Sequence, residues 1–280
     1  MKPSARISVG TVSHWHFRAA GGVFAASAGA ELAGQALRGA AGAGPTGWCL
    51  LLAAGAWLVG LVWRERVGVL RAWLCVAWVM LMSVLVMMLA ERHGFLFGRI
   101  EFTGREILRF GQVPLSVPLL WWLVVGGGYL VVENLWGEWR AGLSAFTALV
   151  TVQMALMILP FVGRLRGYWR WPATSAGSPT DEGYFGVPWT VLAAWFALAL
   201  GLALGLVFLG DNWSSAEART RRQAWTPPTV LLMLTVICFG ANLTAGLWLA
   251  VAFSAANAVL FGAVVVWYLR DRGEGNNPIR

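Results

Sequence analysis

The sequence predicts an all-α, polytopic integral membrane protein: a helical bundle with about seven transmembrane helices (six to eight). First, 58% of its 280 residues are hydrophobic and only 12% are charged, whereas soluble proteins carry about 25% charged residues. Second, the apolar residues form runs of the length that crosses a bilayer, about 20 residues. Third, most of the 18 tryptophans lie at the ends of these runs, where aromatic side chains meet the membrane–water interface.

Residues 1–45 form an N-terminal segment that is first polar and then rich in alanine and glycine. Within it, residues 19–37 are apolar enough to suggest an eighth span. Glu31, Gln35 and Arg38 interrupt or border this stretch, so the sequence leaves open whether it crosses the membrane. No compact apolar region with a cleavage site follows the N-terminus, and we therefore expect no cleaved signal peptide.

Residues 46–270 form the transmembrane domain, and a polar tail, 271–280, follows. The seven apolar runs are 46–63, 70–90, 113–132, 141–162, 187–210, 229–246 and 249–269. Pro160 lies near the end of the fourth run, where a missing backbone N–H costs little. Gly126-Gly127-Gly128 predicts a bend or a close helix approach in the third. Gly201 and Gly205, four residues apart, indicate either a closely packed neighbour or a face that tolerates lipid contact.

The middle of each run lacks charged side chains, which argues against ion transport, because ion-coupled carriers usually need an intramembrane charge. The amides there are Gln153, Asn242 and Asn257, and we expect them to form helix–helix hydrogen bonds rather than ligand contacts. The net charge of +8 indicates arginines at phosphate headgroups, not a nucleic-acid partner. Lys and Arg divide 11 to 10 between the two sides, so the positive-inside rule sets no orientation.

The residues that usually bind metals or cofactors are too scattered to form a site. Cys49, Cys75 and Cys238 lie singly within apolar stretches, which favours neither a zinc site nor a disulfide. The three aspartates are far apart in sequence, unlike the clusters that hold Mg²⁺ for prenyl-diphosphate chemistry. HExxH and glycine-rich phosphate loops are absent. We therefore expect no metal and no organic cofactor.

Two polar loops stand out in the apolar chain, at residues 91–113 and 163–189. Two spans separate them, so they must emerge on the same face of the membrane, and we expect them to form one site. The second loop interleaves aromatic residues with arginine and then carries the acidic pair Asp181 and Glu182. Taken alone, the first loop is also compatible with an amphipathic helix at the interface.

The motifs in these loops carry a family resemblance. They are Glu91, Phe97-Gly98-Arg99, Phe102-Thr103-Gly104-Arg105, Val113-Pro114-Leu115 before Trp121, Gly167-Tyr168-Trp169-Arg170-Trp171 and Gly183-Tyr184-Phe185-Gly186-Val187-Pro188. In order and spacing, residues 91–196 resemble the membrane carotenoid 1',2'-hydratases of the bisanhydrobacterioruberin and γ-carotene type. The resemblance implies an all-helical membrane enzyme that adds water across a terminal double bond of an acyclic carotenoid.

That chemistry requires an acid to protonate carbon and a site that tolerates a tertiary cation. A carboxyl group in an apolar loop has a raised pKa and can hold a proton at neutral pH, and aromatic faces attract cations. The candidate proton donors are Glu91, Glu101, Asp181 and Glu182. The candidate substrate-binding residues are Phe97, Arg99, Trp121, Tyr168, Trp169, Trp171 and Tyr184. We expect the polyene to lie in an apolar slot between uncharged spans, with its end at the loops.

Two departures from the family pattern leave the reaction open. Residues 155–160 read Ala-Leu-Met-Ile-Leu-Pro, without the acidic residues that the family carries there. Trp189 follows Pro188, and the asparagine expected soon after it is missing. The alternatives are a carrier that holds a polyisoprenoid without chemistry and a scaffold whose loops bind a partner. For the enzyme, the carrier and the scaffold alike, we expect an integral protein of a bacterial cytoplasmic membrane. The enzyme and the carrier would in addition bind a lipophilic polyene. Nothing in the sequence specifies an oligomeric state.

Overall fold

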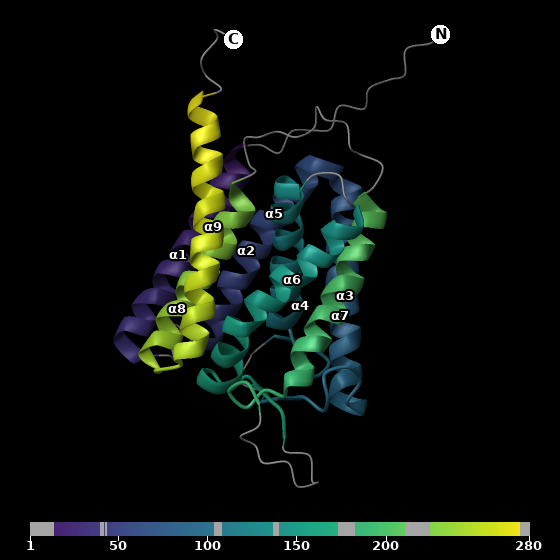
Figure 1. Ribbon diagram of the computed structural model, residues 1–280, viewed down its shortest axis with the longest axis vertical. Coiled ribbons are helices and arrows are strands. Elements are labelled where there is room, and N and C mark those ends of the chain that lie inside the picture. The colour runs from purple at the N-terminus through teal and green to yellow at the C-terminus, as the bar shows by residue number, and fades with distance from the viewer. Residues whose placement is uncertain are drawn as a thin grey trace.

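The computed structural model describes residues 14–39, 42, 44–103, 108–136, 140–172, 183–210 and 225–274. Within these residues the protein is a bundle of long helices that run up and down side by side (Figure 1). The helices are α1 His14–Arg38, α2 Gly44–Val67, α3 Val69–His93, α4 Ser116–Trp121, α5 Gly127–Trp136, α6 Arg140–Leu159, α7 Trp189–Gly210, α8 Thr226–Thr244 and α9 Trp248–Glu274. The π-helical segments are η2 Trp122–Gly126 and η3 Pro160–Leu165, and the strands are β1 Glu101–Phe102, β2 Arg109–Phe110, β3 Val113–Pro114 and β4 Trp169–Arg170.

Seven stretches in the described part of the chain are long and apolar enough to cross a membrane. They coincide with the predicted runs, and the all-α membrane fold is confirmed. Ser116–Leu135, built from α4, η2 and α5, is the central one: 89% of its apolar window is buried, against 28% for α3 and for α9. Since α3 and α9 expose most of their apolar residues, they are the helices whose outer faces suit contact with lipid.

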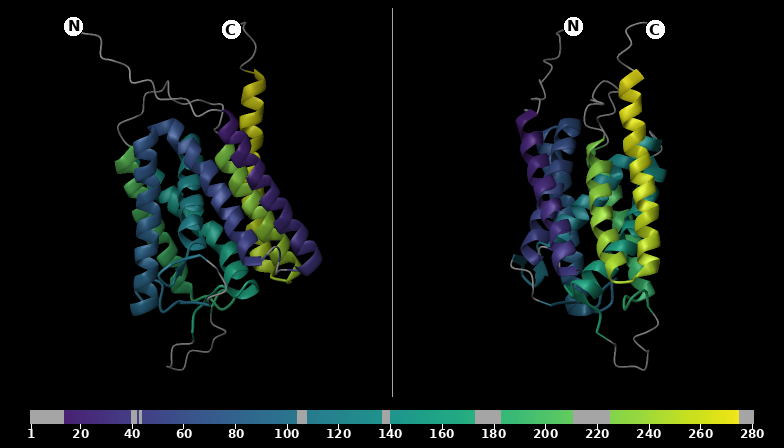
Figure 2. Two further views of the ribbon diagram at one scale, coloured as in Figure 1. Left: turned by 180° about the vertical axis from the view of Figure 1, so that it is seen from behind. Right: turned by 90° about the vertical axis from the view of Figure 1, so that its left-hand side faces the viewer.

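Helix α1 is not among those seven, yet it packs along the full bundle against α2 and α8 (Figure 2). Its buried face carries Phe24, Ala28, Glu31 and Gln35, a spacing of three and four residues that places all of them on one side of a helix. The polar residues that interrupt this segment in the sequence therefore point into the protein and away from lipid.

Glycine allows a very close approach at one point of the bundle. In the central span, a Cβ added at Gly127 would lie 3.6 Å from Val59 of α2 and Leu231 of α8, an ordinary packing distance. On α7, a Cβ at Gly205 would lie 2.0 Å from Nε1 of Trp78, whose indole N–H donates to the carbonyl of Leu202. Gly205 thus makes room for a tryptophan ring of α3. Gly201, one turn earlier, faces open space.

We predict that Gly205→Ala destabilises the protein by about 1–3 kcal/mol, because the methyl group displaces the Trp78 ring from a packed position. Gly201→Ala is the matched control, since nothing lies within 4 Å of its Cβ position. The measurement is the melting temperature of both variants in one detergent. Equal melting temperatures would show that α3 and α7 are not packed in this way.

Candidate functional site

The two polar loops meet at one end of the bundle through an antiparallel pair of short strands. Strand β1 of the first loop pairs with β4 of the second, in a register that sets Glu101 opposite Arg170 and Phe102 opposite Trp169. One residue further along, Thr103 N–H donates to the carbonyl of Tyr168 at 3.0 Å. The prediction that the loops come together is confirmed: residues almost 70 positions apart form one surface at the lower end of the molecule in Figure 1.

The first loop is extended and turned rather than helical in its described residues. Strands β2 and β3 form a tight hairpin around Gly111, which has φ +62°. Before β1, Phe97 N–H donates to the carbonyl of Phe95 at 2.7 Å, and Leu96 between them has φ +62°. Positive φ is costly for a side chain of this size. This turn directs Phe97 into the protein, where it is 1% exposed. The alternative of an amphipathic interfacial helix is therefore wrong for these residues.

Six aromatic side chains lie in and next to the paired strands, in two contacting sets that we together name the loop aromatic cluster. It consists of Phe97 and Phe102 from the first loop, Trp121 from α4, Trp169 and Trp171 from the second loop and Trp195 from α7. The rings of Trp121 and Trp195 stack with centroids 4.4 Å apart. Phe97 meets Trp121 edge to face at 6.4 Å, and Phe102 meets Trp169 edge to face at 6.4 Å. Trp171 donates from Nε1 to the carbonyl of Phe97 at 3.2 Å.

Tyr184 occupies a second position, at the junction of the second loop with α6 and α9. Its ring contacts Phe185, Trp189 and Phe253, and its hydroxyl donates to the carbonyl of Leu156. That carbonyl is available because Pro160, four residues later, has no N–H to donate in return. Burial raises the pKa of Tyr184 above its ordinary value, so the hydroxyl keeps the proton that makes this bond.

The same turn of α6 is held by the two asparagines of the last helices. Asn242 of α8 donates to the carbonyl of Met157 at 3.1 Å. Asn257 of α9 donates to the carbonyl of Gln153 at 3.3 Å and lies 3.6 Å from Sδ of Met157. The expected role of these amides in helix–helix hydrogen bonding is confirmed. Three different elements therefore bond the end of α6, where the helix passes into the π-helical segment η3 instead of stopping at Pro160.

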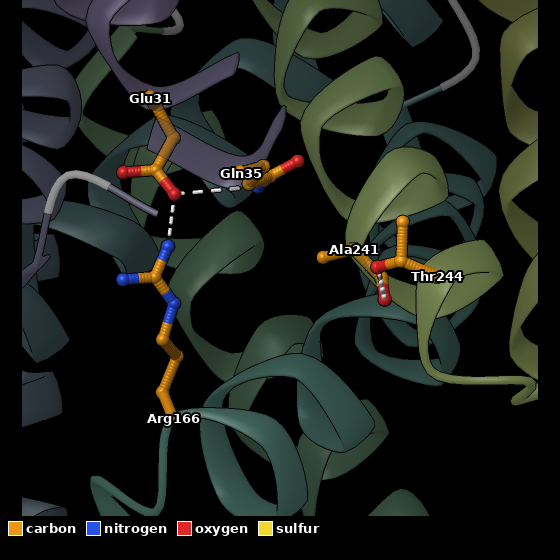
Figure 3. Close-up of polar contacts among 5 residues, drawn as sticks. All are labelled: Glu31, Gln35, Arg166, Ala241 and Thr244. Carbon is orange, nitrogen blue, oxygen red and sulfur yellow. Dashed lines mark hydrogen bonds and ion pairs between the residues drawn. The ribbon is translucent and has the colours of Figure 1, made fainter. Parts of the chain in front are cut away.

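Sequence reasoning missed the buried ion pair behind this end of the molecule. Arg166, at the start of the second loop, pairs with Glu31 of α1, which also accepts from Nε2 of Gln35 at 3.2 Å (Figure 3). The two charged side chains are 2% and 0% exposed, and the guanidinium lies 4.8 Å over the ring of Phe161. Beside them on α8, Thr244 donates to the carbonyl of Ala241. The spacing of Glu31 and Gln35, one turn apart, was the signal that could have revealed a polar buried face on α1.

Gly42 closes the ion pair from the side of the α1–α2 connection. It has φ +51°, and a Cβ there would lie 2.0 Å from Oε1 of Glu31 and 2.3 Å from a terminal guanidinium nitrogen of Arg166. Glycine is thus required at position 42 for two reasons. The backbone has a positive φ, and there is no room for a side chain beside Glu31 and Arg166. This packing excludes water from the ion pair, which fixes α1 to the base of β4.

Two of the four candidate acids belong to the described residues, and neither is buried. Glu91, in the last turn of α3, is half-buried, and Glu101 in β1 is exposed; Arg99 is also exposed. Asp181 and Glu182 lie outside the described residues. Of the aromatic candidates, Phe97, Trp121, Trp169 and Trp171 lie in the loop aromatic cluster, and Tyr168 is buried at the β1–β4 pairing. Tyr184 makes its ring contacts elsewhere, with Phe185, Trp189 and Phe253.

These features define an integral membrane protein with a group of aromatic, largely buried side chains where two paired loops meet the helices. The family comparison is specific: the model of the carotenoid biosynthesis protein family matches residues 46–261. The chain therefore belongs to the carotenoid biosynthesis protein family, and the match covers all seven apolar stretches apart from the first two residues of the first and the end of the last. No curated protein and no solved structure matches the chain significantly.

Removing one partner of the buried ion pair tests whether it anchors the second loop. We predict that Glu31→Ala lowers the free energy of unfolding by about 3–5 kcal/mol, because it leaves the Arg166 guanidinium buried and uncompensated. The double change Glu31→Leu with Arg166→Met should recover most of that loss. Glu133→Ala is the control, since its pair with Arg66 is partly exposed and contributes about 1 kcal/mol or less. Melting of Glu31→Ala at the temperature of the control would contradict the role.

The buried hydroxyl of Tyr184 should make the stability of the protein depend on pH. An unfolded tyrosine ionises near pH 10, whereas the buried one keeps its proton. Above that pH the folded state binds more protons than the unfolded state, so stability falls as pH rises, by about 1.4 kcal/mol per unit. Tyr184→Phe should be less stable at neutral pH by about 1 kcal/mol, from the lost hydrogen bond. It should also show a shallower loss of melting temperature above pH 10. Parallel pH curves for the two proteins would exclude a buried, bonded hydroxyl.

Proposed function

We propose that this protein modifies an acyclic carotenoid by adding water across its terminal carbon–carbon double bond. Membership of the carotenoid biosynthesis family supports the pathway, and the loop motifs that resemble the 1',2'-hydratases support the reaction. The observation that carries the proposal is the β1–β4 pairing. It joins the two motif-bearing loops next to the loop aromatic cluster, where we place the polyene end within reach of an acid and of aromatic rings.

The reaction has two chemical steps. A carboxylic acid transfers its proton to the less substituted carbon of the terminal double bond, and the electron pair of that bond forms the new C–H bond. The tertiary cation left on the neighbouring carbon is then trapped by the oxygen of a water molecule, which returns a proton to the carboxylate. The net change is the addition of one water, with the acid regenerated. Ring faces near the cation stabilise it by about 0.5–2 kcal/mol each.

Glu101 is the acid that we place closest to this chemistry. It belongs to the β1–β4 pair itself and its cross-strand partner is Arg170, on the face of the pair opposite to that of Phe102 and Trp169. Glu91, in the last turn of α3, is the second choice. Both residues reach solvent in the ligand-free protein, so the proposal requires the bound polyene end to cover the acid that acts.

A carrier that holds a polyisoprenoid without changing it is the second candidate. It is favoured by the end of α6, where the family pattern places acidic residues and this chain has none. In this protein the carbonyls of Leu156 and Met157 are bonded instead to Tyr184 and Asn242. Such bonds build a packed, neutral junction, which suits binding better than proton transfer.

Expression of the chain in lycopene-producing cells separates the two functions. We expect a pigment heavier by one water. Glu101→Gln should reduce its yield by about a hundredfold or more, because general acid catalysis contributes about 10²–10⁴ in rate. Glu91→Gln is measured in parallel, and if this variant hydrates lycopene as well as the parent, Glu91 is not the acid. The measurement is mass spectrometry of extracted pigments with the protein level held equal.

Unchanged lycopene that co-purifies with the protein would overturn hydration and support the carrier. Protein recovered colourless from pigment-rich membranes, with no hydrated product in the extract, would count against both candidates.

A further inference from the structure

Two tryptophans of the loop aromatic cluster bury an indole N–H that has no acceptor. Nε1 of Trp121 and Nε1 of Trp169 meet no hydrogen-bond acceptor in the part of the chain that the structure describes. The two residues are only 0% and 3% exposed. A buried indole N–H normally finds a partner, because leaving it unbonded in an apolar environment costs free energy. Both side chains belong to the loop motifs singled out in the sequence.

Other tryptophans of the bundle show how the fold satisfies this group. The indole of Trp63 donates to the carbonyl of Gly126, that of Trp78 to Leu202 and that of Trp122 to Ala56, at 3.0–3.1 Å. Trp122 is adjacent in sequence to Trp121 and as deeply buried. Within one turn of one span, the protein therefore bonds one indole to its own backbone and leaves the next with its donor unused.

The two unused donors are connected through contacts of the paired loops. Trp121 contacts Phe97 edge to face, and the carbonyl of Phe97 is already taken by Trp171, two residues after Trp169. Trp169 lies in β4, where it packs on Phe102 of the first loop. The rings are apolar, whereas the two N–H groups are hydrogen-bond donors that only a ligand with an acceptor atom can satisfy. A pure hydrocarbon has no atom to fill them.

We propose that the site takes a polyisoprenoid whose end carries an oxygen atom, and that the indole N–H groups of Trp121 and Trp169 donate to this oxygen. This inference rests on the proposed function, since it names the end group that the carotenoid site recognises. The oxygen is a hydroxyl oxygen in the simplest case. It comes either from a substrate that arrives oxygenated or from the hydroxyl group that hydration installs, and both present the same acceptor to the same donors.

Binding measurements on the purified protein in lipid nanodiscs test the inference without any need for turnover. The probes are lycopene and the derivative of lycopene with a tertiary hydroxyl group at both ends, each titrated by its visible absorption. The parent protein should bind the hydroxylated ligand more tightly by about fivefold for each hydrogen bond formed. Trp121→Phe and Trp169→Phe should each lose about that factor for the hydroxylated ligand and keep their affinity for lycopene within about twofold, on the same reasoning.

Trp122→Phe is the matched control, because its indole is bonded to the backbone; it should leave the ratio of the two affinities unchanged. If a phenylalanine variant fails to fold, the benzothiophene analogue of tryptophan, introduced at position 121 or 169, removes the N–H while it keeps the shape of the ring. Equal affinity of the parent for the two ligands would overturn the proposal. So would a preference that survives loss of both donors.

The origin of the oxygen follows from incubating the hydroxylated ligand with the parent protein. Its conversion to a pigment other than its dehydration products identifies an oxygenated substrate, whereas its recovery unchanged or its loss of water, with tight binding, identifies the hydration product. The outcome is separable from that of the proposed function. If no hydrated lycopene forms but the hydroxylated ligand is still bound more tightly, the inference holds and the hydratase function is wrong. If lycopene is hydrated but the two ligands bind equally, the hydratase function holds and the inference is wrong.

Discussion

The buried ion pair between Glu31 and Arg166 is the contact on which the arrangement of the site depends. Arg166 directly precedes the segment that becomes β4, and β4 holds β1 and with it the first loop. Glu31 belongs to the one long helix that lacks the apolar character of a span. A buried pair of this kind adds little net stability over an apolar substitute, but it penalises every arrangement in which one charge is left alone. It therefore specifies where α1 and the second loop sit.

At the end of α6, buried backbone carbonyls are satisfied by hydrogen bonds from neighbouring elements rather than by an ion pair. Pro160 interrupts the backbone hydrogen bonds of the span, and the chain continues through a π-helical segment to Leu165. The carbonyls of this stretch are then bonded by Tyr184 from the second loop, Asn242 from α8 and Asn257 from α9. In an apolar medium these bonds are required, because water is not available to replace them. The loop motif around Tyr184 therefore has a structural role.

Much of the architecture could be predicted from the sequence, for a physical reason. A helix that crosses a bilayer needs about 20 apolar residues, so each of the seven spans can be recognised from its own segment of the sequence. The meeting of the two loops follows from counting the crossings between them. Glu31 and Arg166, by contrast, are 135 positions apart, and no local pattern pairs them. Gly205 likewise reads as a small residue in an apolar run, and only the fold shows the Trp78 ring that requires it.

The aromatic part of the candidate site was predictable as a set, although its internal geometry was not. Phe97, Trp121, Trp169 and Trp171 were selected from their motifs. The structure brings Phe97, Trp121 and Trp171 into contact, and it places Trp169 on Phe102 in the paired strands. Trp195, stacked on Trp121, was missed because a tryptophan inside an apolar helix gives no separate signal. Which indoles are bonded to the backbone depends on neighbours from distant helices, and that information is absent from the linear pattern.

The position of α1 has a consequence for biogenesis. This helix precedes the other described helices in the chain, yet its neighbour α8 begins at Thr226 and its charge partner is Arg166. Glu31 must therefore stay hydrated or otherwise compensated until Arg166, 135 positions later, has been synthesised. The contact that fixes α1 to the second loop can form only after the first four apolar stretches have been made, so that maturation of the site follows insertion of those spans.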